Sequence, residues 1–109
     1  MSTQKPQTED SANPFADELT AFQRDILALL VIECESPTSG QTLLDKLEES
    51  GYDTVNHGRL YPNLDSLENM GLLEVGEIDR RTNDYQATEE AKREVEQYQD
   101  WIGCSTIAL

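Results

Sequence analysis

The chain has 109 residues, which is enough for one small domain with a modest hydrophobic core. It contains 22 aspartates and glutamates but only 8 lysines and arginines, so its formal net charge is -14. No run of 18 apolar residues and no signal-peptide-like start are found, which argues against a membrane protein and favours a cytoplasmic one. Two cysteines and one histidine match no metal-ligand spacing, so the sequence predicts neither a metal site nor another cofactor.

The negative charge is spread along the chain rather than collected in a tail. Acidic residues occur throughout the predicted helices, among regularly spaced leucines, and only three of the basic residues are lysines. Low lysine content in a folding sequence is typical of proteins that work in molar salt, where the Debye length is about 3 Å and carboxylate repulsion is screened. A high-salt cytoplasm is the favoured interpretation, and an acidic protein-interaction module is the alternative.

The first predicted elements are a polar arm and two helices. Residues 1–16 hold few apolar side chains and are expected to form a flexible arm. A helix is predicted from near Asp17, because apolar residues recur at helical spacing up to the turn-forming segment 35–40: Leu19, Phe22, Ile26, Leu29 and Leu30. Ser39 is a suitable N-cap for a second helix, which buries Leu43, Leu44 and Leu47 and stops at Gly51.

The next segment predicts a third helix followed by a β-hairpin. Asn56 is the expected N-cap, Gly71 the expected stop, and one face is expected to be buried: Leu60, Leu64, Leu67 and Met70. Residues 72–78 and 85–87 alternate as strands around a polar tip at 79–84, and a short strand near Pro37 and Thr38 is expected to pair with them.

Thr88 is expected to cap a final helix. The order helix-helix-helix-strand-strand-helix predicts a mainly α fold with a small β-wing (α+β), a winged helix-turn-helix over residues 17–88. The remaining core is too small to cover the apolar stripe of the last helix, so residues 89–109 are predicted to form a homodimer through Ala91, Val95, Tyr98, Trp101 and Ile102.

The third helix carries most of the candidate DNA contacts. With Leu60 facing the core, rotation by about 100° per residue points six residues away from it, with Asn63 on a flank: Gly58, Arg59, Pro62, Asp65, Ser66 and Asn69. The predicted DNA contacts of this helix are Asn56, His57, Gly58, Arg59, Tyr61, Pro62, Asn63 and Ser66. Arginine pairs with guanine and asparagine with adenine, so Arg59 and Asn63 are the expected base contacts. Asn56 and His57 lie at the helix start, where a phosphate is favoured. Pro62 predicts a kink or a late helix start.

The predicted hairpin tip holds Arg80 and Arg81, followed by Thr82 and Asn83. Two adjacent arginines in so acidic a chain are expected to contact the DNA backbone or a narrow minor groove. The alternative is that they bridge Asp79 and Asp84. Ser39 and Gln41 are expected to contact the DNA backbone from the start of the second helix.

Two segments resemble the PadR-like family of transcriptional regulators: 58–67 (GRLYPNLDSL) with 70–73 (MGLL), and the hairpin 79–85 (DRRTNDY). The resemblance covers about residues 18–102, and the acidic composition with the segment NHGRLYPNLD is similar to haloarchaeal members. It implies a homodimeric repressor or activator that binds double-stranded DNA, with the third helix in the major groove and the last helix in the dimer. It leaves a small-molecule effector open.

In molar salt the gain from counterion release shrinks, so affinity is expected to come from base contacts, shape and cations shared with phosphate. Bound K⁺ or Na⁺ would then lie near Glu77, Asp79 and Asp84. An enzyme is not expected, because Cys34, Cys104 and His57 show no catalytic spacing. Cys34 is expected to be buried, and a redox role for Cys104 stays open. The main alternative function is an anti-repressor or DNA mimic on the same fold.

Overall fold

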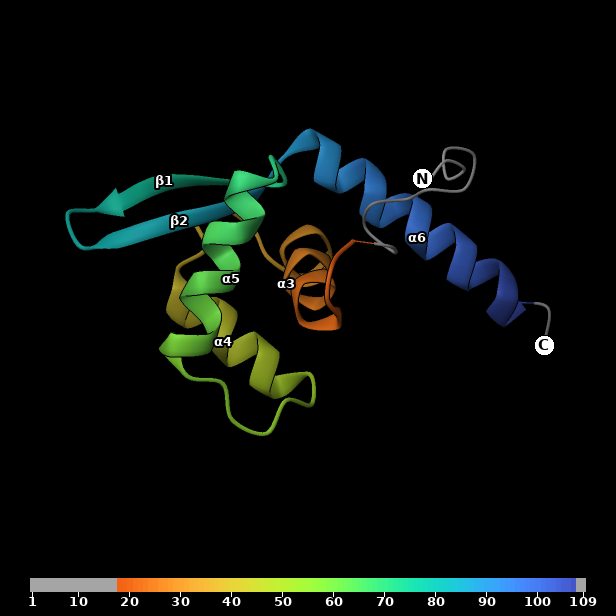
Figure 1. Ribbon diagram of the computed structural model, residues 1–109, viewed down its shortest axis with the longest axis horizontal. Coiled ribbons are helices and arrows are strands. Elements are labelled where there is room, and N and C mark those ends of the chain that lie inside the picture. The colour runs from red at the N-terminus through yellow and green to blue at the C-terminus, as the bar shows by residue number, and fades with distance from the viewer. Residues whose placement is uncertain (1–17, 108–109) are drawn as a thin grey trace, which may run out of the picture.

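The computed structural model describes residues 18–107, with side chains up to Trp101. This part of the chain forms four helices and one two-stranded antiparallel sheet (Figure 1): α3 (Ala21–Ile32), α4 (Gly40–Glu49), α5 (His57–Asn69), β1 (Leu73–Asp79), β2 (Thr82–Ala87) and α6 (Glu89–Ile107). The order and the hairpin confirm the predicted winged helix-turn-helix. The arm expected at residues 1–16 lies outside the described residues.

Side-chain caps fix where the helices begin. The Oγ of Ser39 accepts a hydrogen bond from the N–H of Thr42 (3.1 Å), and Oδ1 of Asn56 accepts one from Arg59 (2.8 Å). Both predicted N-caps are therefore confirmed, as is Thr88, whose Oγ1 accepts from Ala91 (3.2 Å). The first helix differs, because α3 begins at Ala21 after a capping box formed by Thr20 and Gln23, later than the expected start near Asp17.

Two glycines end helices as expected. Gly51 after α4 has φ +125° and Gly71 after α5 has φ +80°, a region of backbone conformation that residues with a Cβ rarely adopt. These turns fold α5 back over α3 and then direct the chain into the hairpin (Figure 1).

The core lies between α3, α4, α5 and the first half of α6. Leu60, Leu64 and Leu67 are at most 1% exposed, which confirms the predicted inner face of α5. Met70 is 45% exposed, so its assignment to that face is wrong. It lies ten residues beyond Leu60, and at 100° per residue this places it about 80° round the helix, at the edge of the buried face.

The hairpin is longer and its tip tighter than expected. Asp79 pairs with Thr82, so Arg80 and Arg81 alone form the turn, and the register shifts between Glu77 and Asp79. No strand forms at residues 37–38. Thr38 nevertheless contacts β2: its C=O accepts from the Tyr85 N–H (2.8 Å) and its N–H donates to Asp84 Oδ1 (2.7 Å). This contact anchors the root of the wing to the segment before α4.

Helix α6 is partly a core helix. Ala91 is fully buried and Val95 is 1% exposed, because α3 covers this stretch, so the prediction that both form a partner surface is wrong. This half of α6 belongs to the common core through Ala91 and Val95. The second half of α6 projects past α3 (Figure 1). There Tyr98 is half-buried and Trp101 is 66% exposed. The Ile102 side chain lies outside the described residues. In the described chain no helix is long and apolar enough to cross a membrane.

Candidate nucleic-acid interface

A polar groove of about 530 Å³ forms where the starts of α4 and α5 meet the wing. It brings together residues from three separate segments: Ser39, Gly40, Gln41, His57, Tyr61, Arg81, Thr82, Asn83 and Tyr85. Seven of these residues were predicted to contact DNA, and Gly40 and Tyr85 were not. The helix starts present backbone N–H groups to an anion, and Arg81 adds a positive charge at the rim.

The wing arginines are not neutralised by the acids beside them. Oδ1 of Asp79 accepts a hydrogen bond from the backbone N–H of Arg81 (2.9 Å), and this bond lowers the pKa of Asp79. Among the described side chains the observed ion pair is Lys92 with Glu89, at 3.2 Å. The alternative in which the arginines bridge Asp79 and Asp84 is therefore not observed.

Asp84 is committed to the structure of the wing root. Its carboxylate accepts hydrogen bonds from the N–H of Thr38 (2.7 Å), Oγ of Ser36 (3.2 Å) and Nε2 of Gln86 (2.8 Å). Burial favours a higher pKa, but these hydrogen bonds outweigh it and hold the pKa of Asp84 below its usual value. Glu77 and Asp79 are both exposed, and Asp79 accepts the hydrogen bond from Arg81. Among the three acids proposed to share cations, only the Glu77 carboxylate makes no hydrogen bond within the described chain.

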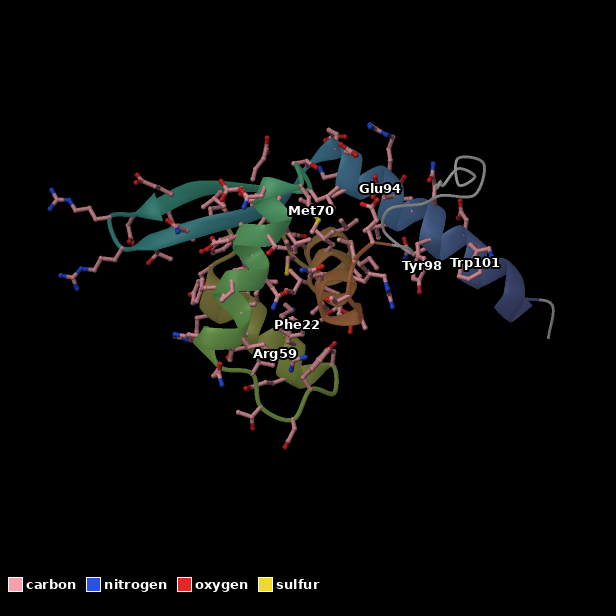
Figure 2. The ribbon with its side chains drawn as sticks, viewed as in Figure 1. Phe22, Arg59, Met70, Glu94, Tyr98 and Trp101 are labelled. Atoms are coloured by element: carbon pink, nitrogen blue, oxygen red, sulfur yellow. The ribbon has the colours of Figure 1, made fainter. Side chains whose placement is uncertain are left out.

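Arg59 and Asn63 differ from the prediction that both are available to bases. The Cζ of Arg59 lies 4.0 Å from the ring centroid of Phe22 (Figure 2). It lies 5.4 Å from the ring centroid of Tyr52. Asn63 is hydrogen-bonded to Gln23 on α3 (3.0 Å). Both side chains therefore turn to the flank of α5 that faces α3, away from the wing. The periodicity placed their Cα positions correctly but could not locate their partners, Phe22 and Gln23 on α3 and Tyr52 between α4 and α5.

The outward face of α5 carries two small residues in its first turns and the exposed Asp65 beside them. Gly58 and Pro62 are exposed one turn apart, and Ser66 is half-buried one turn further. Pro62 lies inside the helix, which starts at His57 and continues to Asn69, so of the two alternatives, a kink or a late start, the late start is not observed. A face built on glycine and proline allows close approach of the helix to another surface.

Gly40 is a site residue that periodicity alone does not reveal. A Cβ at this position would overlap the Oη of Tyr61 and lie 3.0 Å from its Cζ. The absence of a side chain at Gly40 thus lets α4 and α5 meet at the groove. The signal in the sequence is a glycine at the first position of a helix, next to the N-cap, where the helix itself does not require one.

We predict that Gly40→Ala destabilises the protein by about 1–3 kcal/mol, as overpacked cores do. Alanine is ordinarily favoured over glycine in helices by up to about 1 kcal/mol, so the clash must outweigh that gain. Thermal unfolding measures the balance. Gly76→Ala is the matched control, because its Cβ meets no atom within 4 Å. A stability of Gly40→Ala at or above wild type would contradict the proposed packing.

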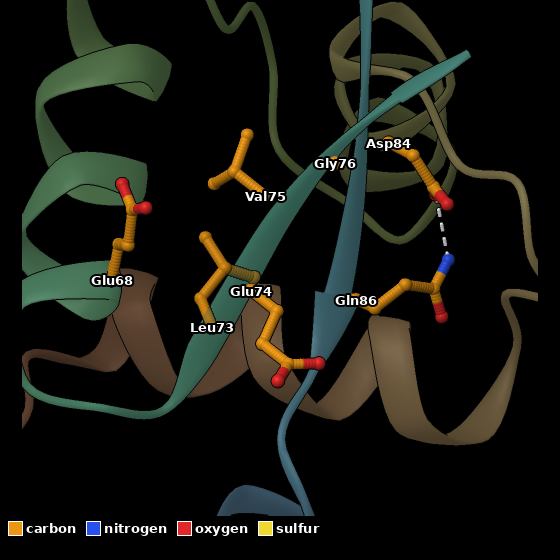
Figure 3. Close-up of a pocket in the computed structure, with 7 residues that line it drawn as sticks. All are labelled: Glu68, Leu73, Glu74, Val75, Gly76, Asp84 and Gln86. Atoms are coloured by element: carbon orange, nitrogen blue, oxygen red, sulfur yellow. Dashed lines mark hydrogen bonds between the residues drawn. The ribbon is translucent and has the colours of Figure 1, made fainter.

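A second groove of about 520 Å³ lies beside the hairpin and carries negative charge (Figure 3). Glu68 and Glu74 stand on either side of Leu73 and Val75, and Nε2 of Gln86 donates to Oδ1 of Asp84 on the same strand, β2 (2.8 Å). Carboxylates at its rim disfavour phosphate, so the two grooves differ in electrostatic character. No group of three or more potential metal ligands occurs in the described residues.

Cys34 is half-buried against the core, where burial raises the pKa of its thiol. This agrees with a packing role. The side chain of Cys104 lies outside the described residues.

A winged helix with a polar groove at its recognition-helix start and arginines at the wing tip defines a DNA-binding domain of the regulator class. Residues 26–97 match the model of the transcriptional regulator PadR-like family, and the chain belongs to that family. It is not an enzyme but a member of a family of transcription regulators. No curated protein matched the chain.

Solved structures agree with this assignment. The complex structure of hsRosR-S4 is 42% identical, with a TM-score of 0.80 over 91% of this chain and 84% of the other. The structure of H. salinarum RosR grown from NaBr is 44% identical, with a TM-score of 0.77 over 86% and 83% of the two chains. A PadR-like transcription factor from Bacteroides fragilis shares the fold at 20% identity, with a TM-score of 0.57 over 76% and 84%. The first two relatives are haloarchaeal, which agrees with the resemblance in the sequence.

Proposed function

We propose that the protein is a sequence-specific transcriptional regulator that binds operator DNA as a homodimer in a high-salt cytoplasm. Helix α5 would enter the major groove, and the β1–β2 hairpin would lie on the backbone or in the adjacent minor groove. The observation that carries the proposal is the convergence of a polar groove and two unneutralised wing arginines on an otherwise anionic molecule.

The contacts divide by chemistry. Ser39 and Gln41 at the start of α4, with His57 at the start of α5, would bind phosphates through backbone N–H groups and short polar side chains. Gly58 and Pro62 would face the floor of the DNA major groove at close range. The wing contacts would be Arg80, Arg81, Thr82 and Asn83.

The homodimer is proposed to form through the projecting half of α6. Tyr98 and Trp101 lie side by side there, with ring centroids 5.8 Å apart, and Trp101 is among the exposed large hydrophobic residues. Exposed aromatic surface of this kind is typical of partner interfaces. A two-fold dimer would bind an inverted repeat whose half-sites lie about one helical turn apart.

The salt dependence of binding follows from the charge. A conventional protein that neutralises six phosphates has a slope of log affinity against log salt of about -5. We expect a slope shallower than about -2 here, because Glu77 and neighbouring acids would retain K⁺ or Na⁺ at the interface. Fluorescence anisotropy with a labelled duplex across a KCl series measures it. Glu77→Gln should steepen the slope, and a conventional slope in the wild type would contradict cation sharing.

The proposal is tested by selecting duplexes from a random 30-base-pair pool with the full chain in molar KCl. Enrichment of one inverted-repeat sequence supports a sequence-specific dimeric regulator. Enrichment of a single half-site would support binding without the dimer. Absence of any enrichment would overturn the proposal.

The second candidate function is an acidic anti-repressor or DNA mimic. The net charge of -14 favours it, because such a surface can occupy the basic site of another protein. A DNA mimic, however, would not need exposed arginines at the wing tip. In the same selection it predicts no enrichment, together with tight binding to a basic DNA-binding domain.

A further inference from the structure

We infer that Arg59 and Asn63 are positioning residues, which brace the first turns of α5 against α3 and set the angle at which α5 meets DNA. Together with Gln23, Phe22 and Tyr52 they form what we call the α5 brace. The inference rests on the proposed function for its DNA consequences, but the brace itself is a property of the unbound protein.

The polar half of the brace is a chain of amide hydrogen bonds. The backbone N–H of Thr20 donates to Oε1 of Gln23 (3.2 Å), and Nε2 of Gln23 donates to Oδ1 of Asn63 (3.0 Å). Nδ2 of Asn63 then donates to the backbone C=O of Arg59 (2.8 Å). Each amide accepts one hydrogen bond through its oxygen and donates one through its nitrogen, so the capping box of α3 is continued directly into α5.

The aromatic half holds the guanidinium. Phe22 and Tyr52 meet edge to face at 5.3 Å, and the Arg59 guanidinium lies over the Phe22 ring at 4.0 Å (Figure 2). The Oη of Tyr52 donates to Oδ2 of Asp25 (2.6 Å), which fixes the second ring. Burial, with the contact to Asp25, raises the pKa of Tyr52 to about 12, so this hydroxyl stays a donor well above neutral pH.

Contacts of this kind suit a protein in concentrated salt. Ion pairs between exposed side chains weaken as the Debye length falls to about 3 Å at 1 M salt. Stacking of a guanidinium on a ring and amide hydrogen bonds act at contact distance, so they lose less. The brace therefore joins α5 to α3 by interactions that do not depend on long-range charge.

Base contact by the same two residues would dismantle the brace. A contact between Asn63 and adenine would compete with its hydrogen bond from Gln23, which is only 7% exposed, and the Nε2 of Gln23 would then lose this partner in the interior. A contact with guanine that drew the Arg59 guanidinium away from Phe22 and Tyr52 would break both ring contacts. Asn63 is also hydrogen-bonded to the backbone C=O of Arg59, so a movement of either residue affects the other.

A double-mutant cycle with Arg59→Ala and Tyr52→Leu tests the brace in the unbound full-length protein. The two changes should be non-additive in thermal unfolding, because each removes one partner of the same contact. Tyr52→Phe keeps the ring and should retain most of the coupling. The control Arg93→Ala, at an exposed arginine of α6, should show none. Additive effects would overturn the inference.

Binding to the selected duplex supplies the second readout. Arg59→Ala should weaken binding to the duplex and to each of its single-base variants by a similar factor, about three- to tenfold, with the order of preference unchanged. Loss of preference at one base pair alone would assign Arg59 to a base contact and overturn the inference. If even the wild type bound no duplex, the proposed function would fail, yet the unfolding cycle would still decide whether the brace exists.

Should Tyr52→Leu fail to fold, amide hydrogen exchange in Arg59→Ala decides the point. Faster exchange confined to the first turns of α5 supports the brace. Unchanged exchange there overturns it.

Discussion

Replacing both Arg80 and Arg81 with alanine is expected to lower the affinity for operator DNA by about ten- to hundredfold, or about 1.4–2.7 kcal/mol. The two residues form the whole turn of the hairpin, and neither guanidinium is neutralised by a carboxylate in the described structure. A wing tip without them would present only Asp79 and polar side chains to the phosphates. Fluorescence anisotropy at fixed KCl measures the loss.

The stability of the double variant should stay close to that of the wild type. Both arginines are exposed, and the hydrogen bond to Asp79 comes from the backbone N–H of Arg81, which alanine retains. Surface substitutions of this kind usually change stability by less than about 0.5 kcal/mol. A loss of affinity without a loss of stability therefore locates the effect at the interface.

A matched control separates the position of the charge from its amount. Lys92→Ala with Arg93→Ala also removes two positive charges from a chain of net charge -14, but on exposed positions of α6. If both double variants lose affinity equally, the overall charge rather than the wing sets the binding. In that case the wing would not be a DNA contact.

The architecture could be predicted because it depends on local chemistry. N-caps at Ser39, Asn56 and Thr88, together with the helix stop at Gly51, act within a few residues of their own position. Leucines at helical spacing then fix which face of each helix is inside. The same local rules gave the hairpin, although its tip proved to be a two-residue turn.

The direction of individual side chains could not be predicted in the same way. Arg59 lies at an exposed position, but its guanidinium is placed by Phe22, which is 37 positions earlier, and by Tyr52. Val95 was assigned to a partner surface because the sequence does not show how much of α3 remains to be covered. Such outcomes depend on how helices cross, which helical periodicity does not contain.

The polar groove at the starts of α4 and α5 combines residues that local sequence signals predict with a contact that they do not predict. His57 and Ser39 follow from helix starts, since both lie where N–H groups are unpaired within the helix. The approach of Gly40 to Tyr61 does not, because it needs the starts of α4 and α5 to be in contact. The functional surface is thus assembled from local signals, but its shape is a tertiary property.

Trp101→Asp is expected to convert the proposed dimer to a monomer. The side chain is 66% exposed on the half of α6 that projects beyond the core, so a carboxylate there costs the folded monomer little. At an interface the same carboxylate would lose its water without gaining a partner, which is strongly unfavourable. Sedimentation or light scattering at micromolar concentration measures the change.

The loss of the dimer should also lower operator affinity by about two orders of magnitude or more, because two half-sites bound together gain from effective concentration. Gln97→Asp is the control, since it adds the same charge at an exposed position of the same helix. A Trp101→Asp protein that remains dimeric would exclude the projecting part of α6 from the interface. If instead both variants became monomeric, general repulsion along α6 rather than the aromatic contact would govern assembly. Molar KCl separates the two causes, because it should remove the repulsion between carboxylates but not the effect of losing the Trp101 ring.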